Sequence, residues 1–349
     1  MKEANNNSGK LIKENSLSKI NDYKNPKNLK FKKDLIKDSY SKTLLDNTSL
    51  IIKTIDDLLL IIYVRNDNAI VCYDIINNQK VNEVRKTHDK IISNLRYYPD
   101  TYNHINLMIS LSSDDNNLKV WNIGNFQCIL DLKDVNATGW INSACFLNDN
   151  NQVYVLSSNA KGFNTSPNPI KVFDLKGKLI KQINNSSNNT YFIDNYYDYK
   201  SSKNYIITGN TCFSTSYDYD KNDIYHKYKD NSKTLYISVI INVNEDKTNL
   251  IASSKDGRIR IWDFHSCALL HNINVSESLY GICLWNNNYL MAGCPNKKIQ
   301  IIDLDDKKVI GEIAGHENIV TMIRKLVHPK YGEVLVSQGH LNDGFKLWI

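Results

Sequence analysis

Acidic residues stand at a repeated distance from large aromatic residues along this chain. The pairs are Asp67 and Tyr73, Asp115 and Trp121, and Asp256 and Trp262, each six residues apart, and Asp343 and Trp348, five apart. A carboxylate in a tight turn between two strands accepts hydrogen bonds from backbone N–H groups and from imidazole. The spacing therefore predicts structural hydrogen bonding rather than acid–base catalysis.

Two histidines precede the aromatic residues at a second repeated distance, about 32 residues. They are His88 in "THDKII" and His316 in "GHENIV". Serines on the neighbouring strands complete a set of side chains that can bury their polar atoms against one another. The predicted members of this hydrogen-bond network are His88, Ser113, Asp115, Trp121, Asp256, Trp262, His316, Ser337, Asp343 and Trp348.

The strands that position these residues recur along the chain. In "SSKDGRIRIWDF", "DG" favours a tight turn and "RIRIW" alternates polar and apolar residues as a half-buried strand does. Related segments are centred on Tyr73, Trp121, Phe173, Tyr217, Trp262, Ile302 and Trp348. Successive copies are 40 to 52 residues apart, which is the period of a four-stranded propeller blade.

These phased copies resemble the WD-repeat β-propeller family over about residues 34–349. The resemblance implies an all-β fold, with seven blades of four antiparallel strands. The chain departs from the family pattern, because only Trp262 is followed by Asp and Gly-His is intact only at Gly315 and His316. Blade three also carries the insertion "AKGFNTSPNP" and blade four has lost most signature residues, so the phasing of blades three to five stays open.

The last blade lacks its outer strand, because the chain ends at Ile349 directly after the third strand of that unit. A closed propeller leaves no exposed sheet edge. We therefore predict that an N-terminal strand closes the ring, with "DLIKDSYS" at 34–41 as the candidate.

The positive charge of the chain is concentrated before this strand. The net charge is +6, and residues 1–38 hold ten lysines against five acidic residues. Residues 1–33 are predicted to be a flexible basic tail, rich in Asn and Lys, and residues 34–349 the propeller. Such a tail binds acidic partners weakly, and nothing in the sequence indicates specific recognition of nucleic acid.

Several classes of function lack their sequence signals. We find no G-x-S-x-G, phosphate-binding glycine loop, H-E-x-x-H or paired Cys and His ligands, so we predict no enzyme activity, cofactor or metal site. His316, His328 and His340 fall at different places in the blade pattern. The seven cysteines are scattered, and the apolar run "LLLIIYV" is too short to span a membrane. We expect a cytoplasmic protein, with the nucleus as the alternative.

Binding to other proteins is the remaining function, through turns that a rigid ring presents on its faces. Trp140, in "ATGWINSACF", is the candidate aromatic anchor, with packing between two blades as the equal alternative. The predicted binding face comprises Asn66, Ile91, Asp114, Trp140, Lys255, Ser278, Ile319 and Asn342.

The predicted role is a non-catalytic scaffold or adaptor. One alternative is a substrate receptor of a cullin-type ubiquitin ligase. Such receptors often carry Arg two residues after Trp-Asp, where this chain has His265. A phosphoinositide-binding propeller is the weaker alternative, because the chain has no Arg-Arg pair.

Overall fold

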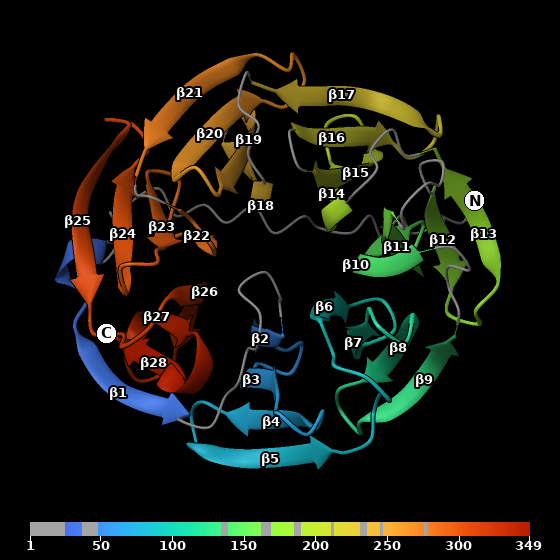
Figure 1. The fold of residues 1–349 in the computed structure, drawn as a ribbon, viewed down its shortest axis with the longest axis horizontal. Helices are drawn as coiled ribbons and strands as arrows, with labels where there is room; N and C mark the ends of the chain where they lie inside the picture. The colour runs from blue at the N-terminus through green and yellow to red at the C-terminus, as the bar shows by residue number, and fades with distance from the viewer. Residues whose placement is uncertain are drawn as a thin grey trace, which may run out of the picture.

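The described part of the chain forms a ring of sheets around a central axis (Figure 1). The computed structural model describes residues 25–36, 48–133, 139–161, 169–184, 190–210, 213–230, 236–244, 247–275 and 278–349. Within these residues there are seven sheets of four strands, and all neighbouring strands run antiparallel. The predicted all-β, seven-bladed propeller is confirmed.

Each blade takes four strands in order from the axis outward. Blade one contains β2 Ser49–Lys53, β3 Leu59–Val64, β4 Ile70–Asp74 and β5 Gln79–Val84, and blade two contains β6 Asn94–Asp100, β7 Ile105–Ser112, β8 Asn117–Asn122 and β9 Gln127–Leu132. Blade three contains β10 Gly139–Asp149, β11 Gln152–Lys161, β12 Ile170–Asp174 and β13 Leu179–Ile183. Blade four contains β14 Thr190–Asp198, β15 Lys203–Asn210, β16 Phe213–Asp218 and β17 Asp223–Lys229. Blade five contains β18 Tyr236–Asn244, β19 Lys247–Ser254, β20 Arg258–Asp263 and β21 Leu269–Asn274. Blade six contains β22 Ile282–Leu284, β23 Tyr289–Gly293, β24 Lys298–Asp303 and β25 Lys308–Ala314. Blade seven contains β26 Val320–His328, β27 Gly332–Gly339, β28 Phe345–Trp348 and, as its outer strand, β1 Phe31–Ile36. The short 3₁₀ helices are η1 Pro26–Asn28 and η2 Leu341–Asp343.

The recurring sequence segments are the third strands of the blades. Tyr73, Trp121 and Trp262 lie in β4, β8 and β20, and Tyr217 lies in β16 although its blade has lost most signature residues. Blades three to five therefore follow the same strand phasing as the other blades. The insertion of blade three falls between β11 and β12, largely outside the described residues.

The N-terminal strand closes the ring, as predicted. In Figure 1, β1 forms the perimeter beside β28, and the C-terminus lies next to it. Phe31 pairs with Trp348 and Asp34 with Lys346, whose Nζ lies 2.9 Å from Asp34 Oδ1. The strand occupies residues 31–36 rather than 34–41, and residues 37–47 lie outside the described part.

Packing explains why the strand begins earlier than the sequence suggested. The ring of Phe31 meets Trp348 edge-on at 5.7 Å between centroids. Leu29 is buried in the same apolar cluster as Trp348, and Lys30 exchanges two backbone hydrogen bonds with Ile349, each 2.9 Å long. The predicted boundary at residue 34 is thus too late, because residues 25–33 already pack on the ring. The rest of the predicted tail, residues 1–24, lies outside the described residues.

The hydrophobic core is divided among the spaces between neighbouring blades. Each of the apolar clusters in the described residues joins two adjacent blades. Ile61 and Val336, for example, belong to the cluster between blades one and seven, and Ile207 and Trp262 to the one between blades four and five. Since no blade buries both of its faces alone, the ring is stable only as a whole.

The two faces of the ring carry different connections. We call the upper face the one formed by the turns between second and third strands, such as residues 65–69, and by the links between blades, such as residues 85–93. The lower face carries the other turns, for example residues 54–58 between β2 and β3. The predicted binding residues belong to upper-face turns and links, except Trp140, which lies at the start of β10.

Candidate functional site

Blade seven contains a complete hydrogen-bonded chain of four side chains beneath the upper face. Trp348 Nε1 donates to Ser337 Oγ at 2.7 Å, and this hydroxyl lies 2.6 Å from His316 Nε2. The other imidazole nitrogen, Nδ1, donates to Asp343 Oδ2 at 2.7 Å. The side chains of His316 and Asp343 are almost fully buried, so the structure brings all four predicted residues together in one buried site.

Two glycines allow this close packing. Gly315 has φ +144°, and a Cβ there would lie 2.8 Å from the Trp348 ring. A Cβ at Gly339 would lie 2.0 Å from Asp343 Oδ2, far inside any permitted contact. Any side chain at either position would therefore displace a member of the network.

Asp343 also fixes the chain around it. Its Oδ2 accepts hydrogen bonds from the backbone N–H groups of Glu317 and Asn318, at 3.0 and 3.1 Å. Burial opposes ionisation of this carboxyl, but the hydrogen bonds and charge of His316, together with these N–H groups, outweigh it and hold the Asp343 pKa well below its usual range. An ionised Asp343 thus ties the turn before β28 to the link before β26.

Blade two builds a looser version with a different serine. His88 Nε2 lies 2.7 Å from Ser110 Oγ, which accepts from Trp121 Nε1 at 2.8 Å. The prediction of Ser113 was wrong, because its hydroxyl lies 2.7 Å from Ser93 Oγ instead.

Strand register explains the choice of serine. Trp121 pairs with Met108, and Trp348 pairs with Leu335, so the serine two residues further on lies on the same side of the sheet as the indole. In both blades this serine is 11 residues before the tryptophan. That spacing, applied from blade seven to blade two, would have identified Ser110.

The carboxylate of blade two stands further from its histidine. His88 Nδ1 is 3.8 Å from Asp115 Oδ2, beyond hydrogen-bond distance. Burial lowers the pKa of His88 to about 4, and the charge of Asp115 offsets this only in part. The imidazole is therefore neutral at neutral pH and cannot serve as a cationic partner for Asp115.

Blade five builds an ion-pair network around a buried arginine of its third strand. Arg260 contacts Asp256 Oδ2 at 2.5 Å, Ser254 Oγ at 2.6 Å and the carboxylate of Asp230. Ala252 occupies the place that the serines occupy in the other two blades, and Trp262 packs on Tyr228. Asp256 is thus part of an ion-pair network rather than a link to Trp262, and Arg260 and Asp230 are members that sequence reasoning missed.

The predicted upper-face residues have different degrees of exposure. Ile91 is 45 % exposed, Ser278 and Ile319 are half-buried, and the exposed polar residues are Asn66, Asp114, Lys255 and Asn342. Trp140 lies in β10, where its backbone pairs with Ala160, but its side chain is outside what the structure describes. Its predicted role as an anchor therefore stays a prediction.

Comparison with known proteins supports the assignment of the repeats. The family model described as "WD domain, G-beta repeat" matches residues 230–263, which contain β19 and β20. The matched segment is a small part of the chain, and it contains the first three strands of blade five in a ring of seven four-stranded blades.

The chain is a seven-bladed β-propeller that contains a WD-type repeat.

A curated protein also resembles part of this WD-repeat propeller. It is the U3 small nucleolar RNA-associated protein 21 homolog of Schizosaccharomyces pombe, which is 29 % identical over 73 residues. The match covers 21 % of this chain and only 8 % of the relative.

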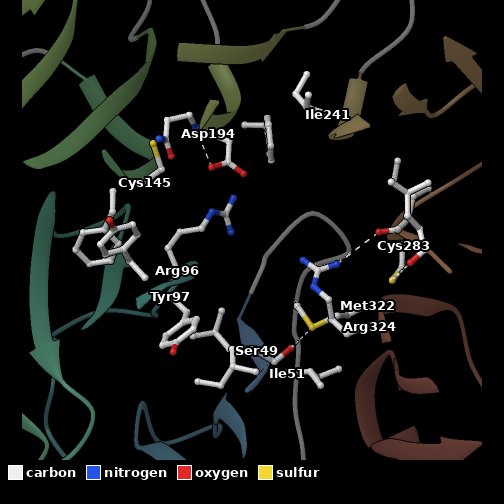
Figure 2. A pocket seen from close by; sticks show the side chains of 18 of the residues that line it. Ser49, Ile51, Arg96, Tyr97, Cys145, Asp194, Ile241, Cys283, Met322 and Arg324 are labelled. Atoms are coloured by element: carbon white, nitrogen blue, oxygen red, sulfur yellow. Dashed lines mark hydrogen bonds between the residues drawn. The ribbon is translucent and has the colours of Figure 1, made fainter. Parts of the chain in front are cut away.

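The axis of the propeller contains a cavity of about 700 Å³, lined by residues of the innermost strands (Figure 2). Arg96 of β6, Asp194 of β14 and Arg324 of β26 point into it. Cys145 and Cys283 also line its wall, and burial raises the pKa of both thiols, so they remain protonated and poorly nucleophilic. Sequence reasoning missed this site, because its residues come from blades far apart in the chain.

Within the described ranges, no three His, Cys, Asp or Glu side chains are grouped so that they could hold a metal ion. None of the helices found there is long and apolar enough to cross a membrane.

Proposed function

We propose that this propeller is a non-catalytic scaffold that binds other proteins through its upper face. The observation that carries the proposal is that polar side chains, among them the buried Asp343, fix the turns and links of that face. Exposed side chains on a fixed backbone bind with less loss of conformational entropy than those on free loops.

Three contacts show how the upper face is fixed. Asp343 holds the link that precedes β26, next to exposed Asn342. Asp115 Oδ2 accepts from Lys90 N at 3.3 Å, and Asn68 Nδ2 donates to Lys90 O at 2.9 Å. Two neighbouring turns thus hold the residue directly before exposed Ile91.

A matched pair of substitutions tests the assigned face. Ile91→Asp places a charge on the upper face, and Leu58→Asp places the same charge on the lower face, where Leu58 is 49 % exposed. After both variants are shown to melt like wild type, proteins captured from native cells are compared. We expect Ile91→Asp to lose specific partners that Leu58→Asp retains, and Trp140→Ala to weaken the same partners by about 2 kcal/mol. Loss with Leu58→Asp alone would overturn the face.

A second candidate role comes from the relative named as U3 small nucleolar RNA-associated. On this reading the propeller is a protein subunit of an assembly that contains that RNA. Recovery of U3 RNA with the tagged chain, and a nucleolar position of that chain in cells, would support it. The predicted cytoplasmic location would support an adaptor outside the nucleolus instead.

The cullin-receptor alternative has less support. His265 stands where such receptors often carry Arg, and its Nδ1 lies 3.3 Å from the hydroxyl of Tyr225. Detection of a cullin among the captured proteins, lost on substitution of His265, would raise this alternative above the scaffold role. No feature described above adds support for the phosphoinositide-binding alternative. A binding assay with vesicles that contain phosphoinositides tests it.

A further inference from the structure

The axial cavity carries more positive than negative side chains on its described walls. Among the described residues that line it, the charged ones are Lys53, Arg96, Asp194 and Arg324. Lys53 lies at the end of β2, and its Nζ forms an ion pair with Asp57 at 2.7 Å. Two guanidinium groups thus share one remaining carboxylate inside the cavity.

Arg324 has donors that point into the cavity without an acceptor. Its Nη1 donates to the backbone oxygens of Ile323 and Ile282, at 3.0 and 3.5 Å. Among the residues that the structure describes, no carboxylate forms an ion pair with Arg324, and its Nε and Nη2 groups make no hydrogen bond. The side chain is exposed and lines the cavity, so these donors face its interior.

The charges of the cavity affect one another electrostatically. Burial lowers the pKa of Arg96, and the positive charge of Arg324 adds to this effect while Asp194 opposes it. Burial raises the pKa of Asp194, which the two arginines only partly offset. The single charge of Asp194 does not balance the two guanidinium charges of Arg96 and Arg324. An additional anion between these guanidiniums would reduce the repulsion that remains between them.

The remaining walls suit an apolar ligand body. Figure 2 shows Ile51, Ile241 and Met322 at other points around the same cavity. A volume of about 700 Å³ lies in the range of small-molecule sites, which are mostly apolar with a few well-placed polar groups.

We propose that the axial cavity binds a small organic phosphate monoester, with Arg324 and Arg96 as the groups that hold the phosphate. A phosphate monoester carries about −1.5 to −2 charge at neutral pH, which matches two guanidiniums better than a single carboxylate does. The planar fork of Arg donates two parallel hydrogen bonds to phosphate oxygens. The ester group then packs on the apolar wall. This site is independent of the protein-binding role proposed for the upper face.

Calorimetric titration of the full-length protein with phenyl phosphate tests the site. We expect one bound ligand per chain, at least about tenfold weaker binding of benzoate, and no detectable binding of phenol. Arg324→Gln should weaken phenyl phosphate by about tenfold or more, as loss of a charge-assisted hydrogen bond does. Asp194→Asn should strengthen it, because the competing carboxylate charge is removed.

Two controls separate this site from general effects. Lys255→Gln removes the same charge from the exposed upper face and should leave the affinity unchanged. If Arg324→Gln fails to melt like wild type, Arg324→Lys keeps the charge without the fork and should still bind more weakly than wild type.

Three results would overturn the proposal. They are no binding of phenyl phosphate to the wild-type chain at millimolar concentration, equal losses in Arg324→Gln and Lys255→Gln, and weaker binding in Asp194→Asn. The last result would show that Asp194 supports binding of the anion rather than competing with it. Tighter binding of benzoate than of phenyl phosphate would assign the site to carboxylates.

Discussion

Trp348 and His316 share a single hydroxyl group, that of Ser337, although they lie at opposite ends of blade seven's sequence. The hydroxyl is 2.7 Å from Trp348 Nε1 and 2.6 Å from His316 Nε2. The chain of hydrogen bonds ends at Asp343, which is buried and ionised. Its members are thus mutually dependent, and removing one leaves the others unpaired in a buried site.

Asp343→Ala should lower the free energy of unfolding by about 2 to 3 kcal/mol, because His316 and two backbone N–H groups lose their acceptor. Urea denaturation measures this change. Asn342→Ala, at the neighbouring exposed position, is the control and should change stability by less than about 0.5 kcal/mol. Equal stability of the two variants would show that the network contributes nothing.

Asp343 also predicts how stability changes in acid. Its folded-state pKa is depressed, so its contribution is fully present above the unfolded pKa of about 4 and is lost as pH falls toward the folded value. Wild type should lose stability below about pH 4 more steeply than Asp343→Asn, in melting experiments from pH 5 to pH 2. Parallel curves would contradict the depressed pKa.

His88 should destabilise the fold at mildly acidic pH. Its folded pKa is about 4, below the unfolded value of about 6.5, so protons bind the unfolded chain first as pH falls. As pH falls between these values, stability should decrease by at most about 1.4 kcal/mol per pH unit from this residue. His88→Gln should flatten the melting temperature across that window. A wild-type curve that is already flat there would rule out the lowered pKa.

Asp256→Ala should cost about 1 to 3 kcal/mol, because it leaves buried Arg260 with fewer acceptors. Asp114→Ala, at an exposed upper-face position, is the matched control, and thermal unfolding compares the two. If Asp256→Ala melts like wild type while partner binding collapses, Asp256 belongs to an interface rather than to the fold.

Closure of the ring predicts the effect of shortening the chain. A chain that begins at Asn25 keeps Leu29, Phe31 and all of β1 and should melt like the full-length protein. One that begins at Thr48 lacks β1, exposes the edge of β28 and should aggregate or unfold. Size-exclusion chromatography and thermal melts check this, and equal melting temperatures would refute closure by β1.

The Lys-rich first 24 residues should affect only weak, salt-dependent contacts. Binding of the full-length chain to an acidic polypeptide should fall strongly as salt rises toward 0.15 M, where the Debye length is about 8 Å. The chain that begins at Asn25 should bind it less at low salt. If specific partners disappear with these residues while Ile91→Asp retains them, the upper face is not the binding surface.

The sequence by itself determined the repeat, the number of blades and the closing of the ring. A strand and its tight turn depend on local residue types, so "RIRIW" and its relatives could be read directly, and a missing outer strand followed from counting. The same local information identified His316, Ser337, Asp343 and Trp348 as one group.

Only the tertiary structure decided which distant side chains meet. Strand register selected Ser110 over Ser113, and packing of Phe31 on Trp348 moved the closing strand to residues 31–36. Arg260 meets Asp230 across a link between blades, 30 residues away in sequence. Arg96, Asp194 and Arg324 converge because ring closure turns one side of each innermost strand toward a common axis, and no local pattern records that geometry.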